Sequence, residues 1–339
     1  MRKDKVRVVQ YGCGLMSKVI MRYLHDHDVE IVGAIDVNPD LIGKDIGPYM
    51  GLDENLGIII SDDADQVLSS CAADVAIVTT FSYMKEMMPF LEQCAEYGIN
   101  VITTGDEAIY PWNTSPMETN RLDRLAKEKG ITIMGTGMQD IYWIAYPALM
   151  AAGCNQVEKI KGTISYNIED YGLAGLDFSS AHLNFNEARE AGAYLWNSGW
   201  NSTEALCARL KLSLKSIHHE TNIITLEEDM ESLVLEKDYK KGEIVGVSLT
   251  TIAQTHQGID LEVECIAKIF NKEEADLCVW EIIGEPNLKT RVERPDTVAL
   301  TCGTVLNRIP SVIQAEPGYV TAEKLADPEF HVHPMHLYL

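Results

Sequence analysis

Two adjacent acids, Asp106 and Glu107, are the side chains of this sequence best suited to proton chemistry. They follow the apolar run Asn100–Thr104, which predicts a buried strand whose carboxyl end presents them. A carboxylate there can hold a substrate ammonium, accept its proton before hydride leaves, and stabilise the iminium that remains. Burial would raise its pKa and suit it to base catalysis near neutral pH. We expect Glu107 to take this role ahead of Asp106; the alternative is that one acid caps the next helical turn while the other is solvated.

A strand–turn–helix–strand pattern near the N-terminus would position a hydride acceptor beside these acids. It consists of the strand Val6–Tyr11, the turn Gly12-Cys13-Gly14, the helix Leu15–His25 and the strand Glu30–Ile35. Gly12 permits the tight turn, and Gly14 lets the backbone approach a pyrophosphate. The amides of Leu15, Met16 and Ser17 open the helix and face the phosphate charge. Ser17 stands where a third glycine is usual, and the alternative is a glycine turn in another kind of α/β protein.

An acid at the end of the second strand indicates which cofactor binds. Asp36 lies 22 residues after Gly14, where a carboxylate can accept hydrogen bonds from both adenosine ribose hydroxyls. Its charge would repel a 2′-phosphate. We therefore expect NAD as the cofactor, with NADP as a secondary one.

Polar and aromatic residues follow two further predicted strands. Asp74–Thr80 is a continuous apolar run, and Thr79, Thr80 and Phe81 come at its end. Ligands of doubly wound sheets bind outside the carboxyl ends of the strands. We expect these three residues and Gly105 to contact the cofactor, although capping of a strand end explains a threonine there almost as well.

Five later residues could line a substrate pocket, and each could equally be structural: Trp143, Tyr166, Tyr171, His256 and Thr301. His256 ends a predicted strand, where it could contact a substrate carboxylate. The tail carries His331, His333 and His336, whose spacing could suit zinc, but a zinc site would need further ligands and supporting hydrogen bonds. We expect no metal site.

The order of elements predicts an α/β protein with two domains. Residues 1–150 alternate strands and helices, which predicts a Rossmann-type, doubly wound parallel sheet. Residues 151–292 mix strands and helices and predict an α+β substrate and dimerisation domain with an open mixed sheet. Residues 293–339 hold a helix and a tail that we expect to return to the first domain.

The composition narrows the class of protein further. The 339 residues include 28 basic and 51 acidic ones, a formal net charge of −23. Such a surface repels nucleic acid and anionic lipid, so we expect neither as a partner. Eight cysteines form no framework, which favours reduced thiols. No apolar signal or membrane-spanning run is evident, so we expect a cytoplasmic protein.

Several phrases of this sequence resemble the 2,4-diaminopentanoate dehydrogenases, which are amine dehydrogenases related to the dihydrodipicolinate reductases through their first domain. The phrases are VVQYGCGLMSK, GAIDVNPDLIGKDIG, TTGDEAIYPW and NRIPSVIQAEPG. The resemblance implies oxidative deamination of 2,4-diaminopentanoate at carbon 4, with NAD or NADP, to 2-amino-4-oxopentanoate and ammonia. This reversible reaction belongs to ornithine degradation.

The resemblance also implies particular site features. A glutamate that binds the reacting amine falls on Glu107, and the small-molecule diamino acid is the partner expected in the cleft. A homodimer joined through the sheet of the second domain is implied as well. Two alternatives stay open: another NAD(P)-dependent amine or amino-acid dehydrogenase on this scaffold, and a non-catalytic NADH-sensing protein.

Overall fold

The computed structural model describes residues 4–171, 199–232 and 238–339. Their contacts divide the chain into two compact units. The first consists of Met1–Ile141 and Ala299–Leu339, and the second of Tyr142–Val298. The sequence-based boundaries, at residues 150 and 292, lie nine residues after the first of these points and six residues before the second.

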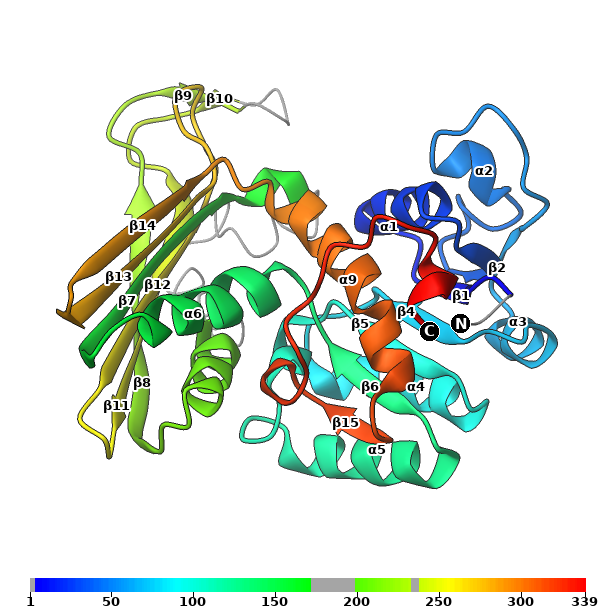
Figure 1. The fold of residues 1–339 in the computed structure, drawn as a ribbon. Coiled ribbons are helices and arrows are strands. Elements are labelled where there is room, and N and C mark those ends of the chain that lie inside the picture. The colour runs from blue at the N-terminus through cyan, green and yellow to red at the C-terminus, as the bar shows by residue number, and fades with distance from the viewer. Residues whose placement is uncertain (1–3, 172–198, 233–237) are drawn as a thin grey trace. The chain divides into compact units, whose positions relative to one another are not determined.

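The first unit is built on a parallel sheet with the strand order β15-β6-β5-β4-β1-β2-β3 (Figure 1). Its strands are β1 (Arg7–Tyr11), β2 (Glu30–Ile35), β3 (Ile60–Ser61), β4 (Val75–Val78), β5 (Asn100–Thr103), β6 (Thr132–Gly135) and β15 (Gly318–Val320). Its helices are α1 (Leu15–Asp26), α2 (Ile46–Tyr49), α3 (Ala64–Ser70), α4 (Met84–Glu96) and α5 (Pro116–Lys129), with α9 (Thr297–Gln314) almost wholly in it.

The central strands of this sheet are apolar because helices cover them. β4 is buried along its whole length, as a strand covered on both faces must be. α4 and α5 pack together, and the main hydrophobic cluster joins their inner faces to the sheet through residues such as Leu91, Leu122 and Val101. α5 ends at Gly130, whose φ of 70° gives the left-handed C-cap that glycine favours.

The last part of the chain completes this unit. β15 pairs in parallel with β6 and extends the sheet by one edge strand. On α9, Arg308 is fully buried and donates to both carboxylate oxygens of Asp140, at 2.6 and 2.7 Å. The same guanidinium donates to the carbonyl oxygen of Ala326 at 2.5 Å. The buried ion pair thus connects α9 and the tail to the loop after β6.

The second unit is built on a mixed sheet with the order β14-β13-β7-β12-β11-β8 (Figure 1). β7 and β12 are parallel, and the other neighbours are antiparallel. Its strands are β7 (Gln156–Asn167), β8 (Leu214–Thr225), β11 (Ile244–Thr255), β12 (Asp260–Lys268), β13 (Leu277–Glu285) and β14 (Leu288–Glu293), and β9 (Met230–Glu231) and β10 (Asp238–Tyr239) form a separate pair. The fold class predicted from the sequence is confirmed.

One face of this mixed sheet is buried, and the other, the open face, is half-exposed as far as the described residues go. β12 alternates buried and half-exposed residues along its length, so that Leu261, Val263 and Cys265 face inward. A helix over residues 199–209 lies on the covered face, where Gly199 is so close to Thr251 that a Cβ would be 3.1 Å from its hydroxyl. α6 (Tyr146–Ala152) packs against β13. The open face carries charged and apolar side chains together.

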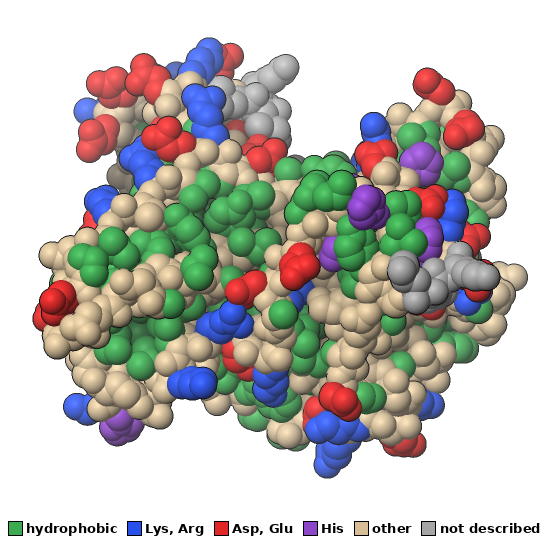
Figure 2. All heavy atoms as spheres, viewed as in Figure 1, with side chains coloured by type: hydrophobic (Ala, Val, Ile, Leu, Met, Phe, Trp, Pro, Cys, Tyr) green, Lys and Arg blue, Asp and Glu red, His purple; other side chains and the backbone are tan. Residues whose placement is uncertain are grey.

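Figure 2 shows acidic and basic side chains interspersed on one face, with hydrophobic side chains gathered over the strands of the second unit. In the described part of the chain, no helix has the length and apolar character needed to cross a membrane.

Candidate active site

The glycine turn between β1 and α1 has the backbone that dinucleotide binding requires. Gly12 has a φ of 89°, and a Cβ there would be 2.8 Å from the carbonyl oxygen of Thr79. Gly14 begins α1, and a Cβ there would meet no atom within 4 Å. Gly12 is therefore required for the turn itself, whereas the hydrogens of Gly14 face open space.

Two buried polar side chains hold this turn in place. Gln10, fully buried in β1, donates to the carbonyl oxygen of Gly12 at 2.8 Å and to the Thr79 hydroxyl at 2.9 Å. The Thr79 hydroxyl in turn donates to the Gly12 carbonyl oxygen at 2.8 Å. The sequence interpretation placed Thr79 at the cofactor and did not single out Gln10. Gln10 could have been identified because its side-chain amide stands in an otherwise apolar strand and, once buried, needs hydrogen-bond partners.

Asp36 supports the same turn from the end of β2. Its carboxylate accepts from the backbone amide of Cys13 at 2.5 Å and from that of Asn38 at 2.7 Å. A carboxylate can accept about four hydrogen bonds, so capacity for ribose hydroxyls is left. Burial raises the pKa of the Cys13 thiol to about 12, with a smaller contribution from the Asp36 charge. Cys13 is therefore an unreactive thiol that fills space in the core.

The start of α1 fits a pyrophosphate. Among the described residues no side chain caps this helix, and its first turn contains no acid. The amides of Leu15 and Met16 open the helix, and Leu15 is 60% exposed. Ser17 is fully buried and donates to the Gly14 carbonyl oxygen at 2.7 Å, which is the close packing that a small residue permits. The helix therefore presents its positive end to the open space beside Gly14.

The other predicted cofactor residues lie at the ends of β4 and β5. Thr80 has a buried hydroxyl with no hydrogen-bond partner in the described part of the chain, so a bound ligand could satisfy it. Phe81 is 48% exposed and contacts Phe90 at 5.7 Å between ring centroids. Gly105 is buried, and a Cβ there would be 2.2 Å from the Met87 sulfur, so this glycine is needed for packing.

The two acids after β5 have different surroundings. Glu107 is only 5% exposed, and its carboxylate accepts from the backbone amide of Met84 at 2.8 Å and from the Ser115 hydroxyl at 2.6 Å. Met84 is the first residue of α4, and Ser115 is the N-cap of α5. The Glu107 charge thus lies at the N-terminus of α4, where the helix dipole favours it.

Asp106 is half-buried and points elsewhere. Its Oδ1 accepts from the Gln139 amide at 2.9 Å, and Oδ2 has no hydrogen bond within the described residues. Burial raises the pKa of Asp106 to about 6, although the Gln139 hydrogen bond acts in the opposite direction. Asp106 is thus a carboxylate that is poised to exchange a proton near neutral pH.

A second glycine turn, after β6, holds Gln139 beside Asp106. A Cβ on Gly137 would be 2.7 Å from the Gln139 side-chain oxygen, so a larger residue there would displace the Gln139 amide. Thr301 on α9, predicted as a substrate contact, is 7% exposed and accepts from the Met138 amide at 3.2 Å. It therefore supports this turn. Asp140, in its buried pair with Arg308, anchors the turn from the other side.

The remaining predicted substrate residues belong to the second unit. Trp143 is 3% exposed, and its indole nitrogen has no partner among the described residues. Tyr166 packs on the hydrophobic cluster around Ile168 and Tyr239. His256 is exposed in the turn between β11 and β12. The side chain of Tyr171 lies outside the described residues. Their roles toward a substrate stay predictions.

The histidine-rich tail has a ring contact within itself and a backbone hydrogen bond to α9. The rings of His331 and Tyr338 lie 4.2 Å apart, and the His331 amide donates to Asn307 at 3.3 Å. In the part of the chain that the structure describes, no three His, Cys, Asp or Glu side chains are grouped as metal ligands.

The doubly wound sheet, the glycine turn with an open helix N-terminus and the acid after β2 define an NAD(P)-dependent dehydrogenase. Comparison with known proteins agrees. Residues 6–135 match the family model described as "Dihydrodipicolinate reductase, N-terminus". The chain is 23% identical to 2,4-diaminopentanoate dehydrogenase of Acetoanaerobium sticklandii over 96% of its own length and 94% of that protein.

Solved structures give the family. The structure of amine dehydrogenase from Mycobacterium smegmatis is 33% identical, with a TM-score of 0.92 over 98% of this chain and 99% of that one. GenD2 from gentamicin A biosynthesis, solved in complex with NAD, has a TM-score of 0.55 at 14% identity, over 86% of this chain and 73% of that one, and shares the fold. The chain belongs to the amine dehydrogenase family represented by the Mycobacterium smegmatis enzyme, as an NAD(P)-dependent oxidoreductase.

Proposed function

We propose that this enzyme oxidatively deaminates 2,4-diaminopentanoate at carbon 4 to 2-amino-4-oxopentanoate and ammonia, and that Asp106 is the acid that handles the proton. The observation that carries the proposal is the half-buried Asp106 carboxylate at the carboxyl end of β5, which has a pKa of about 6 and one oxygen without a hydrogen-bond partner among the described residues. Similarity to the Acetoanaerobium sticklandii enzyme along 96% of this chain supports the choice of substrate.

The residues of the first unit would hold the cofactor through the Gly12–Gly14 turn, the open amides of α1 and the Asp36 carboxylate. When bound, the nicotinamide supplies a hydride acceptor. Asp106 Oδ2 holds the substrate ammonium and accepts one of its protons, which leaves a neutral amine whose nitrogen lone pair assists loss of hydride from the adjacent carbon. Asp106 passes this proton to solvent and, ionised again, stabilises the cationic iminium until water adds and ammonia leaves.

Glu107 acts as a positioning residue in this proposal. Its carboxylate is held by Met84 and Ser115, so it fixes the turn that carries Asp106 to the start of α4 and α5. This order of roles reverses the one expected from the sequence, where Glu107 stood first. Tyr319 adds to the support of the turn by donating to the Ala108 carbonyl oxygen at 2.7 Å.

Matched amide variants test the two roles. We expect Asp106→Asn to lower the rate of deamination by about 10² to 10⁴, while a titration with NAD still gives binding. Glu107→Gln should lose stability, because an amide cannot accept from both partners, yet its kcat/KM should keep the inflection near pH 6 that Asp106 causes. Near-full activity in Asp106→Asn, or loss of that inflection only in Glu107→Gln, would refute the assignment.

A second substrate class is favoured by one observation: identity is higher with the amine dehydrogenase, at 33%, than with the diaminopentanoate enzyme, at 23%. The alternative substrate is therefore a simple amine that lacks the α-amino carboxylate group of 2,4-diaminopentanoate. Initial rates for 2,4-diaminopentanoate beside a panel of simple amines, with NAD and NADP, distinguish the two. A preference for a simple amine would overturn the proposed substrate and leave the role of Asp106 in place.

We also propose a homodimer that buries the open face of the mixed sheet. The support is the half-exposed apolar side chains on that face, among them Val279, Ile266 and Ile252. Mass measurement by light scattering tests it, and a monomer at micromolar concentration would contradict it. The cysteines are all free thiols, which supports the proposed cytoplasmic location. The proposed role in ornithine degradation rests on the proposed substrate alone.

A further inference from the structure

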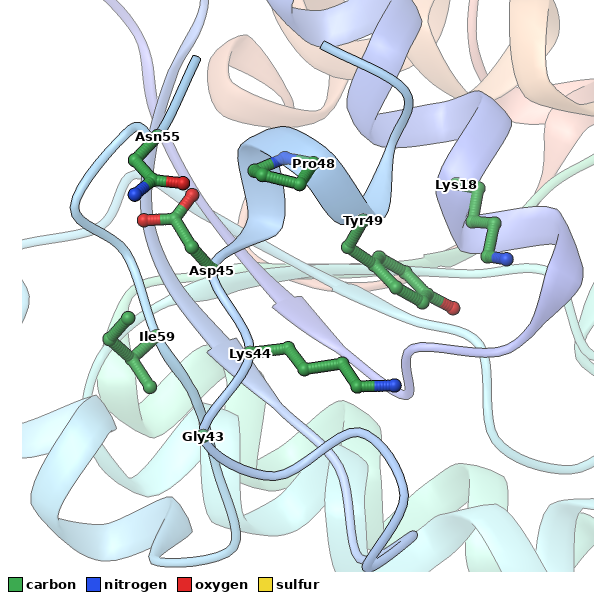
Figure 3. A pocket seen from close by; sticks show the side chains of 8 residues that line it. All are labelled: Lys18, Gly43, Lys44, Asp45, Pro48, Tyr49, Asn55 and Ile59. Carbon is green, nitrogen blue, oxygen red and sulfur yellow. The ribbon is translucent and has the colours of Figure 1, made fainter. Parts of the chain in front are cut away.

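A cavity of about 600 Å³ lies beside α2 in the first unit (Figure 3). Lys18 and Lys44 bring two positive charges to its lining, and in Figure 3 they lie on either side of the Tyr49 ring. Asp45, the carboxylate in this lining, already accepts from three backbone amides at 2.7 to 2.9 Å. The cavity is therefore unsuited to an ammonium group. Acceptor oxygens for the amine have to lie elsewhere, and the carboxyl ends of β5 and β6 provide them.

The side-chain amide of Gln139 is oriented by Asp106. Its Nε2 donates to Asp106 Oδ1 at 2.9 Å. An ionised carboxylate can only accept hydrogen bonds, so the NH2 end of the amide must face Asp106 and the Oε1 end must face away from Oδ1. Within the described residues neither Gln139 Oε1 nor Asp106 Oδ2 has a hydrogen-bond partner. Both side chains are half-buried, and neither oxygen is an enclosed atom, so both keep access to a ligand.

The loop after β6 holds Gln139 in place from both sides along the chain. The amide of the residue before it donates to the Thr301 hydroxyl at 3.2 Å. The residue after it, Asp140, is held in the buried ion pair with Arg308. Thr301 and Arg308 both belong to α9, so this helix fixes the backbone on either side of Gln139. A Cβ on Gly137 would be 2.7 Å from Gln139 Oε1, so glycine provides the space for this oxygen.

The two loops that carry these side chains pack directly on each other. The amide of Thr136 donates to the carbonyl oxygen of Thr103 at 2.9 Å. A Cβ on Gly135 would be 2.2 Å from the carbonyl oxygen of Ala108, so the close approach at this point requires glycine. Asp106 lies between Thr103 and Ala108 in the chain. The separation of the acid from the amide is thus set by backbone contacts as well as by their own hydrogen bond, which preorganises the pair.

The deamination of a primary amine calls for two acceptors at the reacting nitrogen. The ammonium has three N–H groups, of which one gives its proton to Asp106. After hydride has left carbon 4, the iminium is planar and keeps the other two N–H groups. Asp106 Oδ2 can accept from one of them, and the second needs an acceptor as well, because an unsatisfied donor costs stabilisation. Gln139 Oε1 is the neighbouring acceptor, and since the amide is uncharged it does not compete with Asp106 for the proton.

We propose that Gln139 Oε1 accepts a hydrogen bond from the reacting nitrogen, so that Asp106 and Gln139 together bind both N–H groups of the iminium and make the enzyme specific for primary amines. This inference rests on the proposed role of Asp106. In the reverse direction the same pair selects ammonia as the nitrogen donor. A nitrogen that carries a methyl group forms an iminium with a single N–H, which leaves one of the two oxygens without a donor.

Reductive amination with two nitrogen donors tests this role of Gln139. Initial rates are measured with NADH and either ammonia or methylamine; the ketone is 2-amino-4-oxopentanoate, or butanone in the case that simple amines are preferred. We expect the unchanged enzyme to favour ammonia in kcat/KM by about a hundredfold or more. Gln139→Met keeps the length of the side chain and removes its oxygen, so it should lower this preference by about tenfold or more. Because the ratio is compared between proteins, the different basicities of the two amines cancel.

The pH profile gives a second measurement on the same variant. Gln139→Met also removes the hydrogen bond that lowers the pKa of Asp106, so the inflection of kcat/KM should move above pH 6. Gln93→Met is the matched control, because Gln93 on α4 donates to Asp65 on α3 at the same distance of 2.9 Å. It should leave the preference for ammonia and the inflection unchanged.

Two outcomes would overturn the proposal. One is an equal loss of rate with ammonia and methylamine in Gln139→Met, which is the result of a purely structural role. The other is an unchanged enzyme that uses methylamine as readily as ammonia, a result that requires no variant to fold. Near-full activity in Asp106→Asn would refute the proposed function itself, whereas an inactive Asp106→Asn with an unaltered ratio in Gln139→Met would refute the role of Gln139 alone.

Discussion

The buried pair of Arg308 and Asp140 gives the sharpest test of how the structure supports its site. Both side chains are 1% exposed, and Arg308 makes two hydrogen bonds to Asp140 and one to Ala326. Arg308→Met keeps a long apolar stem and removes the charge. The Asp140 carboxylate then stays buried with one neutral donor, the Thr136 hydroxyl at 2.9 Å.

Breaking a buried pair on one side costs about 3 to 5 kcal/mol, because a charge is left without compensation. We therefore expect Arg308→Met to lower the free energy of unfolding of the first unit by this amount. The double variant with Asp140→Leu removes both charges. It takes the partner from the Thr136 hydroxyl, at a cost of about 1 to 3 kcal/mol, and like the single variant it takes the Arg308 donor from the Ala326 carbonyl oxygen, so it should be the more stable of the two.

Hydrogen exchange of the amides in β6 and α9 measures this loss in the first unit alone, which urea unfolding of a chain with two units does not. Arg22→Met is the control, since the Arg22–Asp26 pair is exposed and should contribute less than about 1 kcal/mol. A loss below about 1 kcal/mol in Arg308→Met, or a double variant as unstable as the single one, would refute the reasoning.

Three further perturbations have defined outcomes. Asp106 has a pKa of about 6 in the folded protein, against 3.8 for an unperturbed aspartate. Its contribution to the free energy of unfolding is therefore fully present below pH 3.8 and is lost as the pH rises through 6, a decline of about 3 kcal/mol. Asp106→Asn should remove this decline, as measured by thermal unfolding at several pH values. Gly12→Ala should abolish NAD binding in a fluorescence titration, because the added Cβ would be too close to the Thr79 carbonyl oxygen. Gly98 has a φ of 71° and open space around it, so Gly98→Ala should lower the free energy of unfolding by only about 1 to 2 kcal/mol. Gln10→Leu removes the donor from the Gly12 carbonyl oxygen and should weaken NAD binding and lower the melting temperature together.

The sequence predicted the elements whose signals are local. β1, the glycine turn, α1 and β2 follow from short apolar runs and glycine spacing. β15 was not predicted, because three residues carry no periodicity and its pairing with β6 joins segments far apart in the chain. β14 was not predicted either, since its alternating polar residues resemble a surface loop.

The two acids after β5 show where sequence reasoning about a site ends. Adjacent carboxylates on a short helical turn point in different directions, and which one is buried depends on partners elsewhere. Met84 and Ser115 take Glu107, whereas Gln139 on another loop takes one oxygen of Asp106. These partners follow from the packing of three loops, so the spacing of residues could identify the pair of acids and could not rank them.

The pairing of β15 with β6 has a consequence for how the protein is made. Translation proceeds from the N-terminus, and the strand that covers the edge of β6 is encoded more than 180 residues later. Until the ribosome has released that segment, the nascent first unit has an open apolar strand edge while the whole second unit is synthesised. Such an edge can pair with other chains, so the growing polypeptide is a natural client for chaperones during this interval.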